Sequence, residues 1–275
     1  MRAFFSRFAR HRAALLGFVV LVAVLSLAVA GPFLYPRDAF ELVGQPFLEP
    51  FGKFLLGTDS LGRDVAAGIV QGARTSLSIG ALAAVVATIL GTLVGGFAGY
   101  FGGRLDSALM RLTEFFQTIP SFIFAILLVA LLQPSIRSVI IAIVVVSWPP
   151  MARLVRGEFL AMRHREFVQA CIGMGMSDMR VIFAHVLPNC LSPIIVSGSL
   201  LVATAILTES GLSFLGLGDP NVMSWGYMIG AGRDFLRHAW WLCAVPGIAI
   251  MLTVLAINLV GDGLNDALNP SLRRM

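Results

Sequence analysis

The fold of this chain is decided at residues 153–188, RLVRGEFLAMRHREFVQACIGMGMSDMRVIFAHVLP. This stretch is rich in charge and cannot itself span a membrane, yet uncharged and strongly apolar blocks flank it, at 138–152 and 186–208. A charged run between two apolar blocks is typical of a segment that leaves a bilayer, passes through water and returns. We therefore expect an aqueous projection between two membrane-spanning helices.

Within this projection, the pattern predicts two helices joined by a tight corner. Apolar residues between positions 154 and 167 recur near helical spacing, with charges between them. Gly175 then breaks the pattern where a helix C-cap favours glycine, and Ser177 followed by Asp178 is typical of the start of a new helix. Such an element, standing in water, is well suited to dock a partner.

The projection resembles the EAA loop in the permease subunits of bacterial ABC importers. It has Gln-Ala-Cys at 169–171, then Gly175, and His-Val-Leu-Pro at 185–188; the family has Glu-Ala-Ala, Gly and a hydrophobic-x-Leu-Pro ending. The wording of 165–189 is most similar to the dipeptide, oligopeptide and nickel permeases. The resemblance implies that a cytosolic ATPase couples to the following residues: Glu166, Gln169, Ala170, Cys171, Gly175, Ser177, Asp178 and Arg180.

The composition indicates an integral membrane protein. Of the 275 residues, 57% are hydrophobic and only 13% are charged, whereas soluble domains carry roughly 25% charge. The net charge of +5 raises nucleic-acid binding as an alternative, but the charges lie in short segments and form no large basic surface. We therefore do not expect bound nucleic acid. Cys171, Cys190 and Cys243 show no metal-ligand spacing, so we do not expect a bound metal either.

Six apolar blocks predict an all-α protein with six transmembrane helices and both termini on one side. The fourth block is short, only about 22 Å as a helix, so Arg137 and Arg153 would have to extend toward the interfaces. The predicted spans are Ala13–Tyr35, Thr75–Gly103, Phe115–Ile136, Ser138–Ala152, Val186–Thr208 and Ala239–Val260.

The distribution of charge predicts the orientation. Most of the 20 Lys and Arg residues fall on the side of the projection, and positive residues concentrate on the cytoplasmic side of a membrane. We expect a cytoplasmic tail (1–12), a first transmembrane helix (13–35), a periplasmic loop (36–74), a transmembrane permease core (75–262) and a second cytoplasmic tail (263–275). The core would contain the cytoplasmic coupling loop 153–188 and the periplasmic loop 209–238.

Three further motifs resemble the same permease family. LGTDSLGRD at 56–64 is, residue by residue, a pair of turns, but as a run it is similar to a family signature. The same holds for GLSFLGLGDPNVMSWG at 211–226 and NLVGDGLNDALNP at 258–270. The resemblance implies these signature residues: Gly57, Asp59, Gly62, Arg63, Asp64, Pro188, Gly216, Trp225, Gly226, Gly261 and Asp262.

Two acidic residues near apolar blocks are candidates for the transport pathway. An acid in a membrane segment is a functional hypothesis by default. For Glu114 the interface is favoured, because Arg111 lies one turn away, and Glu209 could equally lie at a solvated outer boundary. Gly91, Gly95 and Gly99, at four-residue spacing, predict close helix packing. Spans two, three and five, rich in small and polar residues, are favoured to line the path.

The chain lacks the residues for its own energy source. Lys53 is the only lysine, and Phe47 and Phe54 occupy the Gly and Ser/Thr positions that a Walker A loop needs. We therefore expect a transport subunit and not an enzyme. The resemblance implies import of dipeptides or oligopeptides across the bacterial inner membrane, with nickel or a metal chelate as the alternative solute and an ion-coupled secondary transporter as a more distant one.

The resemblance also implies the partners. These are a homologous second permease, two ATP-binding cassette ATPases that hold ATP and Mg²⁺, a periplasmic substrate-binding protein that carries most of the specificity, and membrane lipid. No cofactor is expected on this chain.

Overall fold

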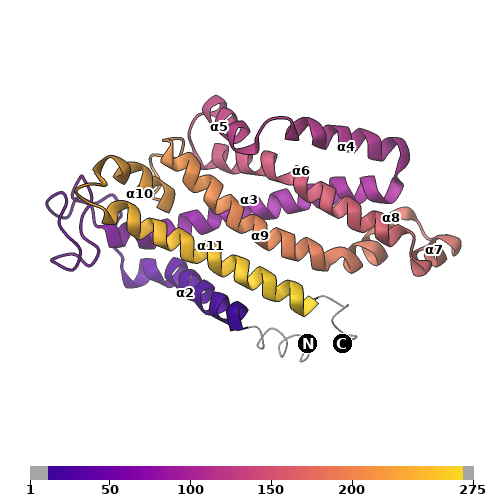
Figure 1. The fold of residues 1–275 in the computed structure, drawn as a ribbon, viewed down its shortest axis with the longest axis horizontal. Helices are drawn as coiled ribbons and strands as arrows, with labels where there is room; N and C mark the ends of the chain where they lie inside the picture. Colours follow the sequence, from indigo (N-terminus) through magenta and orange to yellow (C-terminus); the bar gives the residue numbers. More distant parts are fainter. Residues whose placement is uncertain (1–11, 269–275) are drawn as a thin grey trace.

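The computed structural model describes residues 12–268, and this range is almost wholly helical, without a β-strand. Long helices run side by side along the molecule (Figure 1). The elements are α2 (Arg12–Leu34), α3 (Val65–Phe101), α4 (Gly103–Gln117), α5 (Ser121–Leu132), α6 (Ile136–Arg163), α7 (Glu166–Gly173), α8 (Asp178–Arg180), the π-helix η1 (Val181–Val186), α9 (Leu187–Phe214), α10 (Trp225–Gly232), the 3-10 helix η2 (Arg233–Phe235) and α11 (Trp241–Leu268).

Figure 1 places α7 and α8 at one end of the bundle, with α10 and the 35–64 loop at the other. The beginning of α2 and the end of α11 both lie toward the α7 end, as an even number of crossings requires. Among residues 12–268, five helices are long and apolar enough to span a membrane, and the bent pair α4–α5, counted as one span, brings the number to six. The predicted all-α membrane fold is confirmed. Most of the predicted tails, 1–11 and 269–275, lies outside the described residues.

The second span begins ten residues earlier than predicted. Asp64 caps α3, its Oδ1 accepting from the Ala66 amide at 2.9 Å. The lone Arg74 interrupts the uncharged block, but its side chain is exposed and the helix continues past it. The predicted loop 36–74 therefore ends at residue 64.

The third span is not the single helix predicted at 115–136. α4 and α5 meet at 79° across residues 118–120. Pro120 explains the break, because it has no amide hydrogen and disfavours helical backbone in the residue before it. The residues between the predicted second and third spans, 104–114, belong to α4.

The fourth span is much longer than the predicted 138–152. α6 has 28 residues, about 42 Å at the α-helical rise, so the first part of the predicted projection is its last turns. Arg156 is accommodated there because its guanidinium forms two bonds to Asp106 of α4, at 2.5 and 2.7 Å. The true projection, here called the projecting loop, comprises residues 164–186.

Close packing of α3 on α6 forms the centre of the bundle, and small residues make it possible. A Cβ added to Gly95 would lie 2.1 Å from the Ala152 carbonyl oxygen, and one added to Gly99 would lie 2.7 Å from the Arg156 carbonyl oxygen. The close approach predicted for this glycine series is confirmed. The last two spans are also longer than predicted, since α9 continues to Phe214 and α11 to Leu268.

Candidate functional site

The projecting loop has the predicted helix, corner and helix. α7 ends in a Schellman motif: the Gly175 amide donates to the Ile172 carbonyl at 2.9 Å and the Met176 amide to the Cys171 carbonyl at 3.2 Å. Gly175 has φ +76°, a left-handed conformation that glycine adopts without strain. Ser177 takes the N-cap position of α8 with extended backbone, although its side chain makes no capping bond.

The last part of the projecting loop, directly before α9, is the π-helix η1, which the sequence did not predict. Its cause is Pro188, whose ring conflicts with the carbonyl four residues earlier and which has no amide to donate. Widening of the helix relieves that conflict. The Asn189 side chain donates to the His185 carbonyl at 2.7 Å, which satisfies an acceptor in the widened turn.

One face of α7 is buried against the bundle. Val168 and Cys171, three residues apart, pack in a core cluster with Val181, Phe159 and Tyr100. Cys171 is only 7% exposed. Helical periodicity turns it away from the outer surface, so its predicted part in ATPase coupling stays a prediction and would act through the packing of α7.

The other face of the loop is open. Glu166, Ala170, Gly175, Ser177 and Arg180 are exposed. Large apolar side chains accompany them, and Met174 is the most open at 69% exposure. The exposed apolar residues of the loop are Phe167, Ile172, Met174, Met179 and Phe183.

Two of the predicted coupling residues hold the loop to its own chain. The Tyr100 hydroxyl donates to Asp178 Oδ1 at 2.9 Å, which fixes α8 to the end of α3. The Gln169 side-chain amide donates to the Arg163 carbonyl at 2.9 Å, which closes the turn between α6 and α7. An exposed residue of the projecting loop can therefore already be hydrogen-bonded within its own chain, and exposure alone does not make its side chain available to a partner.

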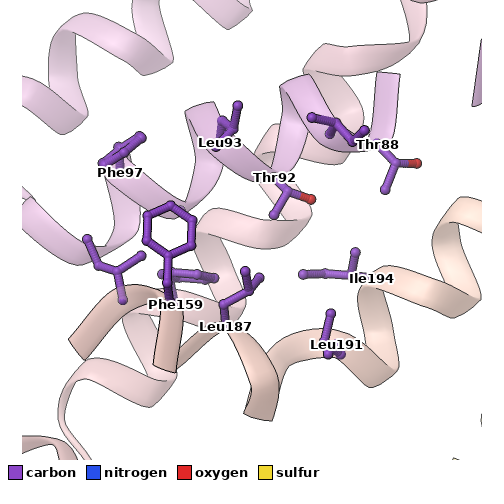
Figure 2. A pocket seen from close by; sticks show the side chains of 12 residues that line it. Thr88, Thr92, Leu93, Phe97, Phe159, Leu187, Leu191 and Ile194 are labelled. Carbon is purple, nitrogen blue, oxygen red and sulfur yellow. The ribbon is translucent and has the colours of Figure 1, made fainter. Parts of the chain in front are cut away.

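An apolar pocket of about 290 Å³ lies at the root of the loop. Figure 2 shows side chains of α3, including Thr88 and Thr92, facing Leu191 and Ile194 of α9 across it. The hydroxyl oxygens of Thr88 and Thr92 are buried and have no hydrogen-bond partner among the described residues. Side chains of η1 complete the wall. Because of this pocket, the base of the projecting loop is less tightly packed than the α3–α6 contact.

The opposite end of the bundle is held by the LGTDSLGRD motif. Asp64 binds Tyr35 and Arg37 as well as capping α3, the Arg37 bond being 2.8 Å long. Burial and the neighbouring Asp64 carboxylate raise the pKa of Tyr35. Gly57 and Gly62 both have positive φ, as turns require.

The remaining signature residues also serve the fold. Asp59 accepts from the Leu61 and Arg63 amides, and the Arg63 guanidinium lies 4.9 Å from the Phe40 ring centre. Gly216, with φ +81°, ends α9. Gly261 lies where α11 meets α9, its added Cβ 3.2 Å from Ser199 Oγ, and Asp262 is exposed.

Glu209 is not at a solvated boundary. It is 2% exposed because α9 continues past it. Its carboxylate accepts from the hydroxyls of Ser213 and Ser224, both at 2.8 Å, with the Ser210 and Ser76 hydroxyls at 3.4 and 3.5 Å. Four serines from three parts of the chain thus surround one acid.

This arrangement holds α10 in place. Ser224 caps α10 by accepting from the Tyr227 amide at 3.0 Å, and the Trp225 amide donates to Ser76 of α3. Trp225 is fully buried, and a Cβ on Gly226 would lie 2.6 Å from Ser210 Cα. Glu114, by contrast, is exposed on α4. The two predicted pathway acids are therefore in unlike surroundings, and their pathway role stays a prediction.

Comparison with known proteins identifies similar chains over the whole length. Residues 91–274 match the family model of the binding-protein-dependent transport system inner membrane component, and residues 1–50 match the N-terminal TM domain of oligopeptide transport permease C. The di/tripeptide transport system permease protein DppC of Pseudomonas aeruginosa is 39% identical, with 99% of this chain and 93% of the relative covered.

The dipeptide transport system permease protein DppC of Escherichia coli K12 is 41% identical, with 100% of this chain and 94% of the relative covered. Among solved structures, the inward-facing MetNI methionine ABC transporter is similar in fold, with TM-score 0.60 and 18% identity. That match covers 70% of this chain and 92% of the other.

Proposed function

Because the chain belongs to the family of binding-protein-dependent transport system inner membrane components, as a multi-pass permease subunit of an ABC importer, we propose that it moves dipeptides and short oligopeptides into the cytoplasm. The peptide solute is supported by the named relatives, which are permeases of dipeptide and di/tripeptide systems. ATPase subunits would supply the energy through the projecting loop.

The observation that carries the coupling role is the two-sided construction of the loop. Val168 and Cys171 anchor α7 in the core, and Asp178 is tied to Tyr100. The outer side exposes Met174 and its apolar neighbours. Apolar side chains on a braced support are what a stable protein interface needs, because their burial contributes affinity and little is lost in ordering them.

Charge distribution supports the orientation. The loop end carries most of the Lys and Arg residues, so it would face the cytoplasm, where ATPases are. The 35–64 loop and α10 would then face the periplasm, where a substrate-binding protein would deliver peptide. Within this assembly we place a homologous second permease beside the chain, and ATP with Mg²⁺ on two ATPases.

The test is purification of the complete importer in lipid nanodiscs, followed by ATPase and uptake assays. We expect a second permease, ATPases and a binding protein to co-purify. We also expect the dipeptide alanylalanine to be taken up only when ATP is present. Uptake of Ni²⁺ or its chelate in place of peptide would reassign the solute. Uptake driven by an ion gradient, with no ATPase bound, would overturn the coupling role of the loop.

A further inference from the structure

A second cavity, whose mainly apolar lining includes five hydroxyl side chains, lies between α5, α6 and α9. Its volume is about 430 Å³, and it is here called the hydroxyl groove. The lining residues are Ser121 of α5; Val146, Ser147, Pro150, Met151 and Leu154 of α6; and Ser197, Leu200, Leu201, Thr204 and Thr208 of α9. None of these residues carries a charge.

The groove lies near the middle of the bundle. Ser147 is well inside α6, which runs from Ile136 to Arg163, and Thr204 is well inside α9, which runs from Leu187 to Phe214. Polar groups at this depth are unfavourable against lipid. Three helices nevertheless direct hydroxyls to one place, which is typical of a wall that faces a polar path.

The hydroxyls offer both kinds of hydrogen-bonding group. Thr204 and Thr208 donate to the carbonyls of Leu201 and Thr204 at 2.9 and 2.8 Å, so their oxygens remain as acceptors. Ser121, Ser147 and Ser197 have no side-chain hydrogen bond to another described residue and can donate as well as accept.

Two prolines add backbone acceptors on α6. Pro149 and Pro150 stand inside the helix, and neither has an amide hydrogen. The carbonyls of Val145 and Val146 therefore cannot receive the usual bond from four residues later. Such carbonyls are tolerated at membrane depth where they adjoin a polar space, and Val146 lines the groove.

From this lining we propose that the hydroxyl groove is the wall contributed by this chain to the peptide path, and that it binds the main chain of the peptide. The proposal rests on the proposed function. Amide N–H groups match the threonine and carbonyl acceptors, and peptide carbonyls match the serine donors. Since every dipeptide except those ending in proline has both groups, the groove would accept peptides with widely different side chains. The absence of charge from the lining would keep binding weak enough for release.

The test uses the reconstituted importer and measures peptide uptake alongside ATP hydrolysis. The double variant Ser147→Ala, Thr204→Val removes two hydroxyls with little change of shape. We expect its uptake per ATP to fall about fivefold or more, by the same factor for peptides with small, aromatic and charged side chains. Ser199→Ala is the matched control, because it removes an α9 hydroxyl that faces α11 instead.

A depsipeptide, in which an ester replaces the amide, separates main-chain recognition from simple blockage. It has no amide N–H for the acceptor of Thr204, so Thr204→Val should slow the dipeptide and leave depsipeptide uptake unchanged. Equal slowing of both, or dipeptide uptake at the normal rate in the double variant, would overturn the proposal. Failure of the unaltered importer to take up any peptide would instead refute the proposed function.

Labelling of Thr204→Cys covers the case in which the double variant does not assemble. A membrane-impermeant maleimide should modify this thiol, and dipeptide should slow the modification, if water and peptide reach the groove. No modification in the working importer would place the residue against lipid or protein and would overturn the proposal.

Discussion

Gly175 at the corner of the projecting loop provides the sharpest test of how the loop works. In Gly175→Asp the new Cβ would meet no atom within 4 Å, so steric conflict with the bundle is excluded. The cost is backbone strain at φ +76°, at most about 1–2 kcal/mol, because aspartate enters the left-handed region more readily than most residues. That strain acts on the corner alone, because the core-facing residues Val168 and Cys171 precede it on α7.

The expected result is a loss of ATPase binding without a loss of the folded permease. Strain of this size corresponds to roughly a 5- to 30-fold shift between the ordered corner and its alternatives, and the charge at an apolar docking surface adds to the loss. Binding of purified ATPase to the permease in nanodiscs gives the first quantity, and yield of monodisperse permease from membranes gives the second. Gly175→Asn should lose less, since asparagine tolerates left-handed backbone as aspartate does but adds no charge at the docking surface.

Gly103→Asp is the matched control. Gly103 has φ +57° and, like Gly175, no neighbour within 4 Å of an added Cβ, but it begins α4 and lies outside the projecting loop. We expect this variant to bind ATPase as the unaltered chain does. Equal loss of membrane yield and of ATPase binding in Gly175→Asp would refute the reasoning, because the corner would then belong to the folding core.

Three other substitutions test the supports of the loop and the bundle. Tyr100→Phe removes the partly buried hydrogen bond to Asp178, of order 1 kcal/mol; we expect transported peptide per ATP to fall several-fold with little change in melting temperature. Gly95→Val places atoms where the Ala152 carbonyl lies, so α3 and α6 must separate; the cost, about 1–3 kcal/mol or more, should appear as a lower melting temperature in detergent. Glu209→Leu leaves its serine donors without an acceptor and should lower the melting temperature, because each unmet group costs about 1–3 kcal/mol; Glu209→Gln keeps an acceptor and should lose less.

The sequence predicted the number and order of the spans because charge is unfavourable in lipid. Span boundaries were harder to predict for the same reason. Arg74 and Arg153 were treated as ends, yet both are exposed and their helices continue past them. Arg156, one turn further along α6, is paired with Asp106. The bend at Pro120 was overlooked because the span was predicted from the absence of charge, which does not show where a helix bends. Gly175 was recognised because the C-cap of a helix favours glycine.

Side-chain partners distant in sequence could not be predicted. Asp178 meets Tyr100 across 78 positions, and no local pattern links them. The surroundings of Glu209 require serines from α3, α9 and the start of α10 to converge. A lone acid in an apolar block therefore has the same sequence signature whether it binds a solute or holds a helix in place.

The π-helix η1, at the end of the projecting loop, leads directly into α9, the helix that carries three of the five hydroxyl residues of the hydroxyl groove. One residue of α-helix corresponds to a turn of about 100°, and a π turn holds its bonds one residue further along than an α turn. If the six residues Val181–Val186 returned to α bonding, α9 would rotate about its own axis relative to the loop by up to that angle. Displacement of the projecting loop by a partner would then rotate α9 about its axis. Thr204 and Ser197 would come to face different neighbouring helices. The chain thus has, at Pro188, a site where linear displacement can become rotation.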